Sequence, residues 1–161
     1  MAPVFSVLLV ALLATSTGHC VSGTGNSPFT FAPGFSPTTL EVPGPRGRVD
    51  FVTMSRPFTS TIFATDPVCS FQGQFFPCRL FRTTVPRAGF VQVKIIFTNT
   101  RFRFGLVLPH SNGAFGGSPL FGGTRTSGAG DVEFAVVLIG ADGRAPAPDA
   151  SETFEVTASV Q

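Results

Sequence analysis

The sequence contains neither tryptophan nor tyrosine, although nineteen phenylalanines are spread along its 161 residues. Carbohydrate-binding platforms usually depend on Trp and Tyr, which combine a hydrophobic ring with a polar group. The absence of both therefore counts against a sugar-binding face. We expect the Phe side chains to fill a hydrophobic core instead, because Phe is among the residues most often buried.

Charged residues are also scarce, at 12% of the chain, and the formal net charge is only +2. Lys94 is the only lysine, and the arginines are scattered rather than clustered. A protein that follows a phosphate backbone needs several cations on one face. Nucleic acid is therefore not an expected partner, whereas the 43% of hydrophobic residues is enough for the core of one domain.

Long hydrophobic runs are absent, apart from a short one at residues 4–14. Its length is that of the apolar region of a signal peptide, and it is too short to span a bilayer. Small and polar residues follow it, and cleavage after Gly18 or Gly23 fits them. We expect a signal peptide at 1–23, a flexible arm rich in Gly, Pro and Ser at 24–37, one folded domain at 38–161, and no membrane span.

The chain has only three cysteines. Cys69 and Cys78 enclose a short segment that contains Gly and Pro, and in an oxidising compartment they are expected to form a disulfide. Cys20 follows the apolar run near the place of the acylated cysteine of a bacterial lipoprotein, but His19 breaks the lipobox pattern. We therefore expect a secreted or periplasmic protein, and the alternative is a surface lipoprotein anchored at Cys20.

Apolar residues alternate with polar ones along much of the remaining chain, as they do in half-buried strands. This pattern predicts strands at 49–53, 91–97, 102–108, 132–138 and 154–160, with weaker candidates at 38–42, 60–65 and 79–85. In the first of these, Val49 and Phe51 are expected on the apolar face. Turn signals such as Ala141-Asp142-Gly143 separate the strands. About seven to eight strands predict an all-β fold, an antiparallel β-sandwich with jelly-roll-like or Ig-like topology, and a closed barrel is the alternative.

Four segments in succession suggest a family. They are Phe81-Arg-Thr-Thr-Val-Pro-Arg-Ala-Gly-Phe-Val-Gln-Val93, Leu106-Val-Leu108, Ala129-Gly-Asp-Val-Glu-Phe134 and Glu152-Thr-Phe-Glu-Val156. This order, over about residues 79–160, resembles the bacterial pre-peptidase C-terminal domain, a small sandwich found on secreted proteases and in stand-alone exported proteins. The resemblance implies a non-catalytic accessory role. The family tends to carry acidic residues before its Leu-x-Leu strand, where this chain has Arg103-Phe104-Gly105, so a site built on those acids does not carry over.

Few side chains are suited to catalysis. His110 is the only histidine beyond the predicted signal peptide, and the sequence has no Gly-x-Ser-x-Gly elbow. Asp131 and Glu133 share one strand face and in isolation would suit a retaining glycosidase. A solvated strand edge accounts for them better. We therefore expect no catalytic residues, and a small hydrolase using this carboxylate pair is the remaining alternative.

Binding residues are also few. Asp142, Asp149 and Glu152 surround a Pro-rich loop and could offer oxygen ligands to Ca²⁺, but their spacing matches no defined calcium loop, and neither a metal nor a cofactor is predicted. Arg101 and Arg103, expected beside Lys94, and His110 are the candidate partner-binding residues. The Gly-rich segment 109–130 reads as a long flexible loop and is the expected contact surface. The sequence thus predicts an exported, non-enzymatic binding or accessory module with an unidentified extracellular protein or polymer as its partner.

Overall fold

The computed structural model of the chain describes Val42, residues 47–111 and residues 113–161. The predicted signal peptide, the predicted arm and Cys20 lie outside the described residues. The predicted strand 38–42 also lies outside them, except for Val42, which is not in a strand. Within the described residues no helix has the length and apolar character that crossing a membrane requires.

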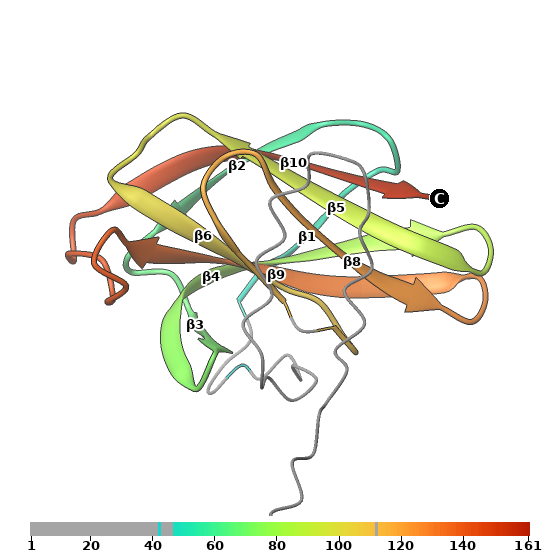
Figure 1. Cartoon of the computed structure of the whole chain (residues 1–161), viewed down its shortest axis with the longest axis horizontal. Coiled ribbons are helices and arrows are strands. Elements are labelled where there is room, and N and C mark those ends of the chain that lie inside the picture. The colour runs from blue at the N-terminus through green and yellow to red at the C-terminus, as the bar shows by residue number, and fades with distance from the viewer. Residues whose placement is uncertain (1–41, 43–46, 112) are drawn as a thin grey trace, which may run out of the picture.

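The described chain forms two facing sheets, so the predicted β-sandwich is confirmed (Figure 1). The larger sheet has the order β1-β4-β9-β6-β7 with β3 attached to β4, and the smaller sheet has the order β2-β10-β5-β8. Among the described strands every pairing is antiparallel except that of β1 with β4. The strands are β1 Val49–Phe51, β2 Phe58–Phe63, β3 Val68–Phe71, β4 Gln74–Val85, β5 Gly89–Phe97, β6 Phe102–Val107, β7 Ala114–Gly116, β8 Leu120–Thr126, β9 Gly130–Gly140 and β10 Ser151–Val160.

The main core lies between the two sheets and is built on phenylalanine. Phe81, Phe104 and Phe134 project from the larger sheet and meet Phe154 of β10. The ring centroids of Phe104 and Phe154 lie 5.1 Å apart, and those of Phe81 and Phe154 lie 5.9 Å apart in an edge-to-face contact. All four rings are buried, so the expectation that Phe fills the core is confirmed for these positions. Full burial of each such ring contributes about 1.5–3 kcal/mol to the stability of the fold.

Strand β4 takes part first in a hairpin with β3 and then in the larger sheet. Its first residues pair with β3 to form a hairpin, and from Cys78 onward it pairs with β9 as an inner strand of the larger sheet. Gln72 and Gly73 form the two-residue turn of the hairpin with φ of +53° and +76°, which is the type I′ geometry that suits the twist of a hairpin. The predicted disulfide between Cys69 and Cys78 is present, with its Cα atoms 5.6 Å apart.

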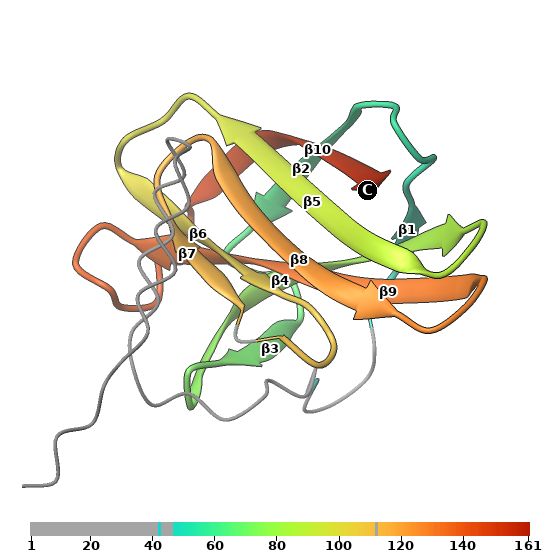
Figure 2. The same ribbon diagram turned by 45° about the vertical axis from the view of Figure 1, so that its right-hand side comes forward.

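A second core lies on the outer face of the larger sheet, where the β3–β4 hairpin covers it. Figures 1 and 2 both show β3 on the side of β4 that faces away from the smaller sheet. Phe71 and Phe76 of the hairpin pack there against Val137 and Ile139 of β9. Strand β9 is therefore buried on both faces, which explains why its middle residues are almost uniformly apolar.

The outer face of the larger sheet changes from apolar to charged between neighbouring rows of side chains. Leu80 pairs with Ala135 across β4 and β9, and both are buried in the second core. Two residues further along β4, Arg82 pairs with Glu133, beyond the reach of the hairpin. The hairpin thus covers one half of this face and leaves the other half to solvent.

The structure corrects several expectations. Asp50 of β1 and Val52, the residue after β1, are buried, and Phe51 is 55% exposed, so the expected orientation of this segment is inverted. The segment 109–130 is not a long loop, because it contains β7 and β8. The described residues form ten strands, because β3, β7 and β8, which were not predicted, add to the seven predicted strands in this part of the chain.

Candidate functional site

An aromatic pocket opens on the outer face of the larger sheet beside the hairpin. It has a volume of about 200 Å³ and is lined by Phe71, Gln72, Gln74, Phe76, Phe115, Ile139 and Gly143. Phe71, Phe76 and Ile139 are buried members of the second core, whereas Phe115 of β7 is 40% exposed. The ring centroids of Phe71 and Phe115 lie 6.3 Å apart. The pocket thus has an apolar floor, one exposed aromatic wall and a rim that carries two glutamine amides.

Arg103 lies next to this pocket. Its guanidinium carbon is 5.6 Å from the centroid of the Phe115 ring, which is within the range of a cation–π interaction. Among the described residues no carboxylate forms an ion pair with Arg103 or Arg101. The side chain of Arg103 is exposed, so its charge is available to a ligand.

A hollow of about 700 Å³ has Arg103 in its own lining, and we call it the polar hollow after the Thr, Asn and Ser side chains of its wall. Its lining includes Thr98, Asn99, Thr100, Arg103, Gly117 and Ser118, together with Phe97 and Phe102. Asn99 accepts a hydrogen bond from the amide of Arg101 through Oδ1, and Ser118 Oγ accepts one from the amide of Phe97. These bonds fix the β5–β6 turn that carries the polar wall. We call Arg103, the aromatic pocket and this polar hollow together the Arg103 surface.

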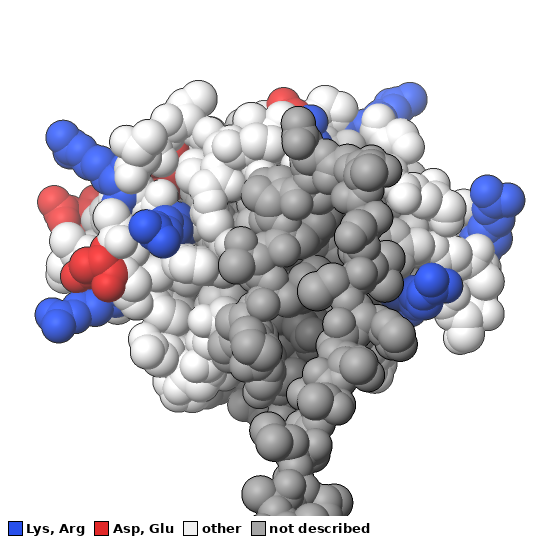
Figure 3. All heavy atoms as spheres, in the orientation of Figure 1, with Lys and Arg blue, Asp and Glu red and all other residues white. Residues whose placement is uncertain are grey.

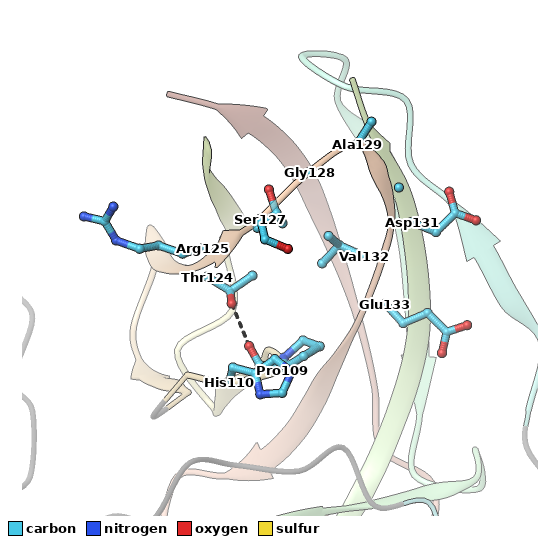
Figure 4. Close-up of a pocket in the computed structure, with 12 residues that line it drawn as sticks. Pro109, His110, Thr124, Arg125, Ser127, Gly128, Ala129, Asp131, Val132 and Glu133 are labelled. Atoms are coloured by element: carbon cyan, nitrogen blue, oxygen red, sulfur yellow. Dashed lines mark hydrogen bonds between the residues drawn. The ribbon is translucent and has the colours of Figure 1, made fainter. Parts of the chain in front are cut away.

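Another hollow, of about 350 Å³, lies near the far end of β6 and contains His110 (Figure 4). Thr124 donates a hydrogen bond to the carbonyl of Pro109 and ties β8 to this turn. Val132 points toward Thr124 and Ser127, whereas the carboxylates of Asp131 and Glu133 point the opposite way (Figure 4). His110 has φ of +54°, a left-handed conformation that is uncommon for residues other than Gly, although His is enriched in it.

The carboxylate pair lies within the larger sheet and not at the edge where it was expected. Glu133 Oε1 accepts a hydrogen bond of 2.6 Å from Arg82, and Asp131 accepts one of 2.7 Å from Thr84 Oγ1. The hydrogen bond to Glu133, and after it the negative charge of Glu133, raise the pKa of Arg82 above its usual range. The two acids share one face of β9 and bind neighbours on β4. They therefore do not face each other across a cleft, as the pair of a retaining glycosidase must.

The possible calcium ligands make separate contacts. Asp142 accepts a hydrogen bond from the amide of Arg144 within its own turn, and the buried Glu152 accepts one from Asn99 Nδ2 at 2.9 Å. In the part of the chain that the structure describes, no three His, Cys, Asp or Glu side chains gather as they would around a metal ion.

The predicted partner-binding residues are divided between the two ends of β6. Arg101 and Arg103 lie at its start and His110 lies beyond its end. Lys94, expected beside the two arginines, is instead in β5 of the smaller sheet, with its Nζ 6.0 Å from the centroid of the Phe121 ring. Phe115 was not singled out, because one exposed ring among many phenylalanines carries no signal in the sequence. Figure 3 shows Lys and Arg side chains at the left, at the right and along the upper edge of the molecule, and Asp and Glu side chains mainly at the left.

No family model and no curated protein matches the chain. Among solved structures, the pre-peptidase C-terminal domain of a collagenase from Bacillus anthracis is similar, with 8% identity, a TM-score of 0.45, and coverage of 71% of this chain and 98% of that one. The g-type lysozyme inhibitor PliG, a periplasmic protein, is similar in its forms from Aeromonas hydrophila and Salmonella Typhimurium. Their identities are 8% and 12%, their TM-scores 0.44 and 0.41, and they cover 71% and 72% of this chain and 98% and 100% of their own. A pre-peptidase C-terminal domain, from the family that the sequence resembles, is thus among the similar solved structures.

Proposed function

We propose that this chain is an exported, non-enzymatic binding domain that docks a partner protein through the Arg103 surface. One observation carries the proposal: the exposed ring of Phe115 forms the wall of the aromatic pocket and lies beside an arginine without an ion-pair partner among the described residues. Aromatic residues and arginine beside a well-packed pocket are the features that dominate binding energy at protein interfaces.

The disulfide supports export. Cys69 and Cys78 are both buried, and they join the two strands of the hairpin that carries Phe71 and Phe76. Structural disulfides of this kind form in oxidising compartments such as the periplasm and the extracellular space. The choice between a secreted or periplasmic protein and a lipoprotein anchored at Cys20 falls on residues outside the described part. The intact mass of the protein from its native host decides it, because acyl chains on Cys20 would add a defined mass.

The arrangement of the acids supports a role without catalysis. Asp131 and Glu133 are bound by Thr84 and Arg82 on the solvent side of the sheet, and His110 lies on the far side of Val132 (Figure 4). General acid–base chemistry requires such groups to converge on one substrate. Their separation gives the hydrolase alternative no geometric support.

Selection from a library of random peptides displayed on phage tests the proposal. The mature chain is immobilised, and the enriched peptides are measured against variants that keep the fold. Phe115→Ala removes the pocket wall. Gly117→Trp fills the polar hollow, and nothing lies within 4 Å of a Cβ at Gly117. We expect each of these variants to weaken binding at least tenfold.

Two matched controls accompany these variants. Phe63→Ala removes an exposed phenylalanine of the smaller sheet, and Gly128→Trp fills the His110 hollow, where a Cβ at Gly128 likewise meets nothing within 4 Å. Both controls should bind the peptides as the unchanged chain does. Loss of binding in Gly128→Trp alone would move the site to the His110 hollow, and equal binding by all four variants would contradict the proposal.

A further inference from the structure

We infer that the Arg103 surface recognises an extended peptide segment with an apolar side chain and, two positions away, a carboxylate. This inference rests on the proposed function and adds the chemistry of the partner. The apolar side chain enters the aromatic pocket, and the carboxylate binds the guanidinium of Arg103.

The size and lining of the pocket argue for a single apolar side chain. Its volume of about 200 Å³ equals roughly six or seven water molecules at about 30 Å³ each, which is the scale of one large side chain and not of a helix. Phe71, Phe76 and Ile139 supply the carbon surface of its floor, whereas Gln72 and Gln74 supply polar groups at its rim. An aliphatic or aromatic side chain that packs against this floor removes apolar surface from water and so gains binding energy.

The charges around the pocket argue for an acidic neighbour. Arg101 and Arg103 have no ion-pair partner in the described part of the chain. Asp142 and Arg144 flank Gly143, which lines the pocket, and their charges have opposite signs. The carboxylate of Glu152 is buried and accepts a hydrogen bond from Asn99. The exposed charge beside the pocket is therefore positive. A planar guanidinium binds a carboxylate with two parallel hydrogen bonds and so selects this group over other acceptors.

The spacing follows from the geometry of the Arg103 surface. The guanidinium carbon of Arg103 lies 5.6 Å from the ring centroid of Phe115, which is the wall of the pocket. In an extended peptide, side chains that project from the same face are two residues apart, at about 6.5–7 Å. One side chain can thus occupy the pocket while the side chain two positions away reaches Arg103. The rest of the segment continues over the polar hollow, whose lining also includes Arg103.

Titration with designed peptides, followed by the amide resonances of the full mature chain in ¹⁵N spectra, tests this inference. The probe is acetyl-Gly-Leu-Ser-Asp-Gly-amide, and the comparison peptides carry Lys in place of Asp or Gly in place of Leu. We expect the probe to shift the amides of Phe71, Arg103 and Phe115, and each replacement in the peptide to weaken binding at least tenfold.

A reversal of charge provides the sharpest control. Arg103→Glu should bind the Lys peptide better than the Asp peptide, whereas Arg125→Glu, which changes an exposed arginine on β8 of the smaller sheet, should keep the original preference. Binding of the Asp and Lys peptides with equal affinity would overturn the inference. So would self-association of the chain that depends on Phe115, because the occupant would then be a second copy.

Failure of the inference and failure of the proposed function give different results. If the designed peptides leave Phe115 unshifted but peptides from the phage library still require Phe115, the partner chemistry is wrong and the docking surface stands. If binding of the library peptides is also indifferent to Phe115, the docking surface itself is wrong.

Discussion

The ring of Phe71 occupies the place where a side chain at Gly105 would stand. A Cβ added at Gly105 would lie 3.0 Å from Cε1 and Cζ of Phe71 and 2.6 Å from Cγ2 of Val137. The β3–β4 hairpin therefore approaches the sheet closely at Gly105, whose lack of a side chain admits the hairpin that shapes the aromatic pocket.

Gly105→Ala should lower the free energy of unfolding by about 1–3 kcal/mol, because the added methyl group overpacks the second core. Urea denaturation followed by circular dichroism measures the change. Gly117→Ala is the control, since a Cβ there meets nothing within 4 Å, and its effect should stay within about 0.5 kcal/mol. Equal effects of the two substitutions would show that Phe71 does not lie against Gly105 in solution.

Replacement of both Cys69 and Cys78 by Ala should lower the free energy of unfolding by about 2–3 kcal/mol, as the loss of a short covalent loop does in the chain-entropy model. Guanidinium denaturation of the unchanged and the double-substituted chains measures the difference. Adding a reductant should destabilise the unchanged chain by a similar amount and leave the variant as it was. The variant keeps no cysteine other than Cys20, so a reductant effect on it would require a disulfide between two molecules.

Arg82→Gln should lower the unfolding midpoint by a small amount that does not vary between pH 7 and pH 10. The hydrogen bond to Glu133 raises the pKa of Arg82 in the folded state, so its contribution is present below the arginine's usual pKa range and is lost only above that range. Thermal unfolding across this pH interval is the measurement. Because the pair is exposed, 1 M salt should shrink the difference, and a difference that falls toward pH 10 would contradict the assignment.

His110→Val should destabilise the fold by about 1–2 kcal/mol, because a β-branched residue is strained at a φ of +54°. His110→Gly tolerates this conformation and should unfold no earlier than the unchanged chain. Differential scanning calorimetry of both variants decides between backbone strain and a contact of the imidazole, since loss of a contact would make the Gly variant the less stable one. His110→Gly should also keep its peptide binding.

The strands that the sequence predicted are those whose apolar residues alternate. Val91, Val93 and Ile95 of β5 are buried as expected. Strand β8 was missed because glycines at 122 and 123 resemble a loop. They are there for packing, since a Cβ at Gly122 would lie 2.6 Å from Cδ2 of Leu106 and one at Gly123 would collide with Phe90. The glycines of this strand thus make room for side chains of other strands, and the alternation of residues within the strand does not reveal this requirement.

The candidate site was only half predictable for a related reason. Arg103 could be named because a charge beside a strand of apolar residues is conspicuous in the sequence. Phe115 is exposed because β7 is a short strand at the edge of the larger sheet. The ion-pair partner of Glu133 depends on which strand lies beside β9. The topology determines which distant strands pair, and the alternation of apolar and polar residues within a strand does not reveal this pairing.

The walls of the aromatic pocket come from two separate layers. Binding of a molecule in the pocket and packing of the hairpin on the sheet are therefore coupled. Phe71 and Phe76 come from the hairpin, whereas Phe115 and Ile139 come from the sheet beneath it. A molecule bound there clamps one layer to the other, so by linkage it stabilises the docked hairpin by as much as docking strengthens its own binding. The Cys69–Cys78 disulfide, although buried, then acts as a remote determinant of affinity, since anything that loosens the hairpin takes away half of the pocket.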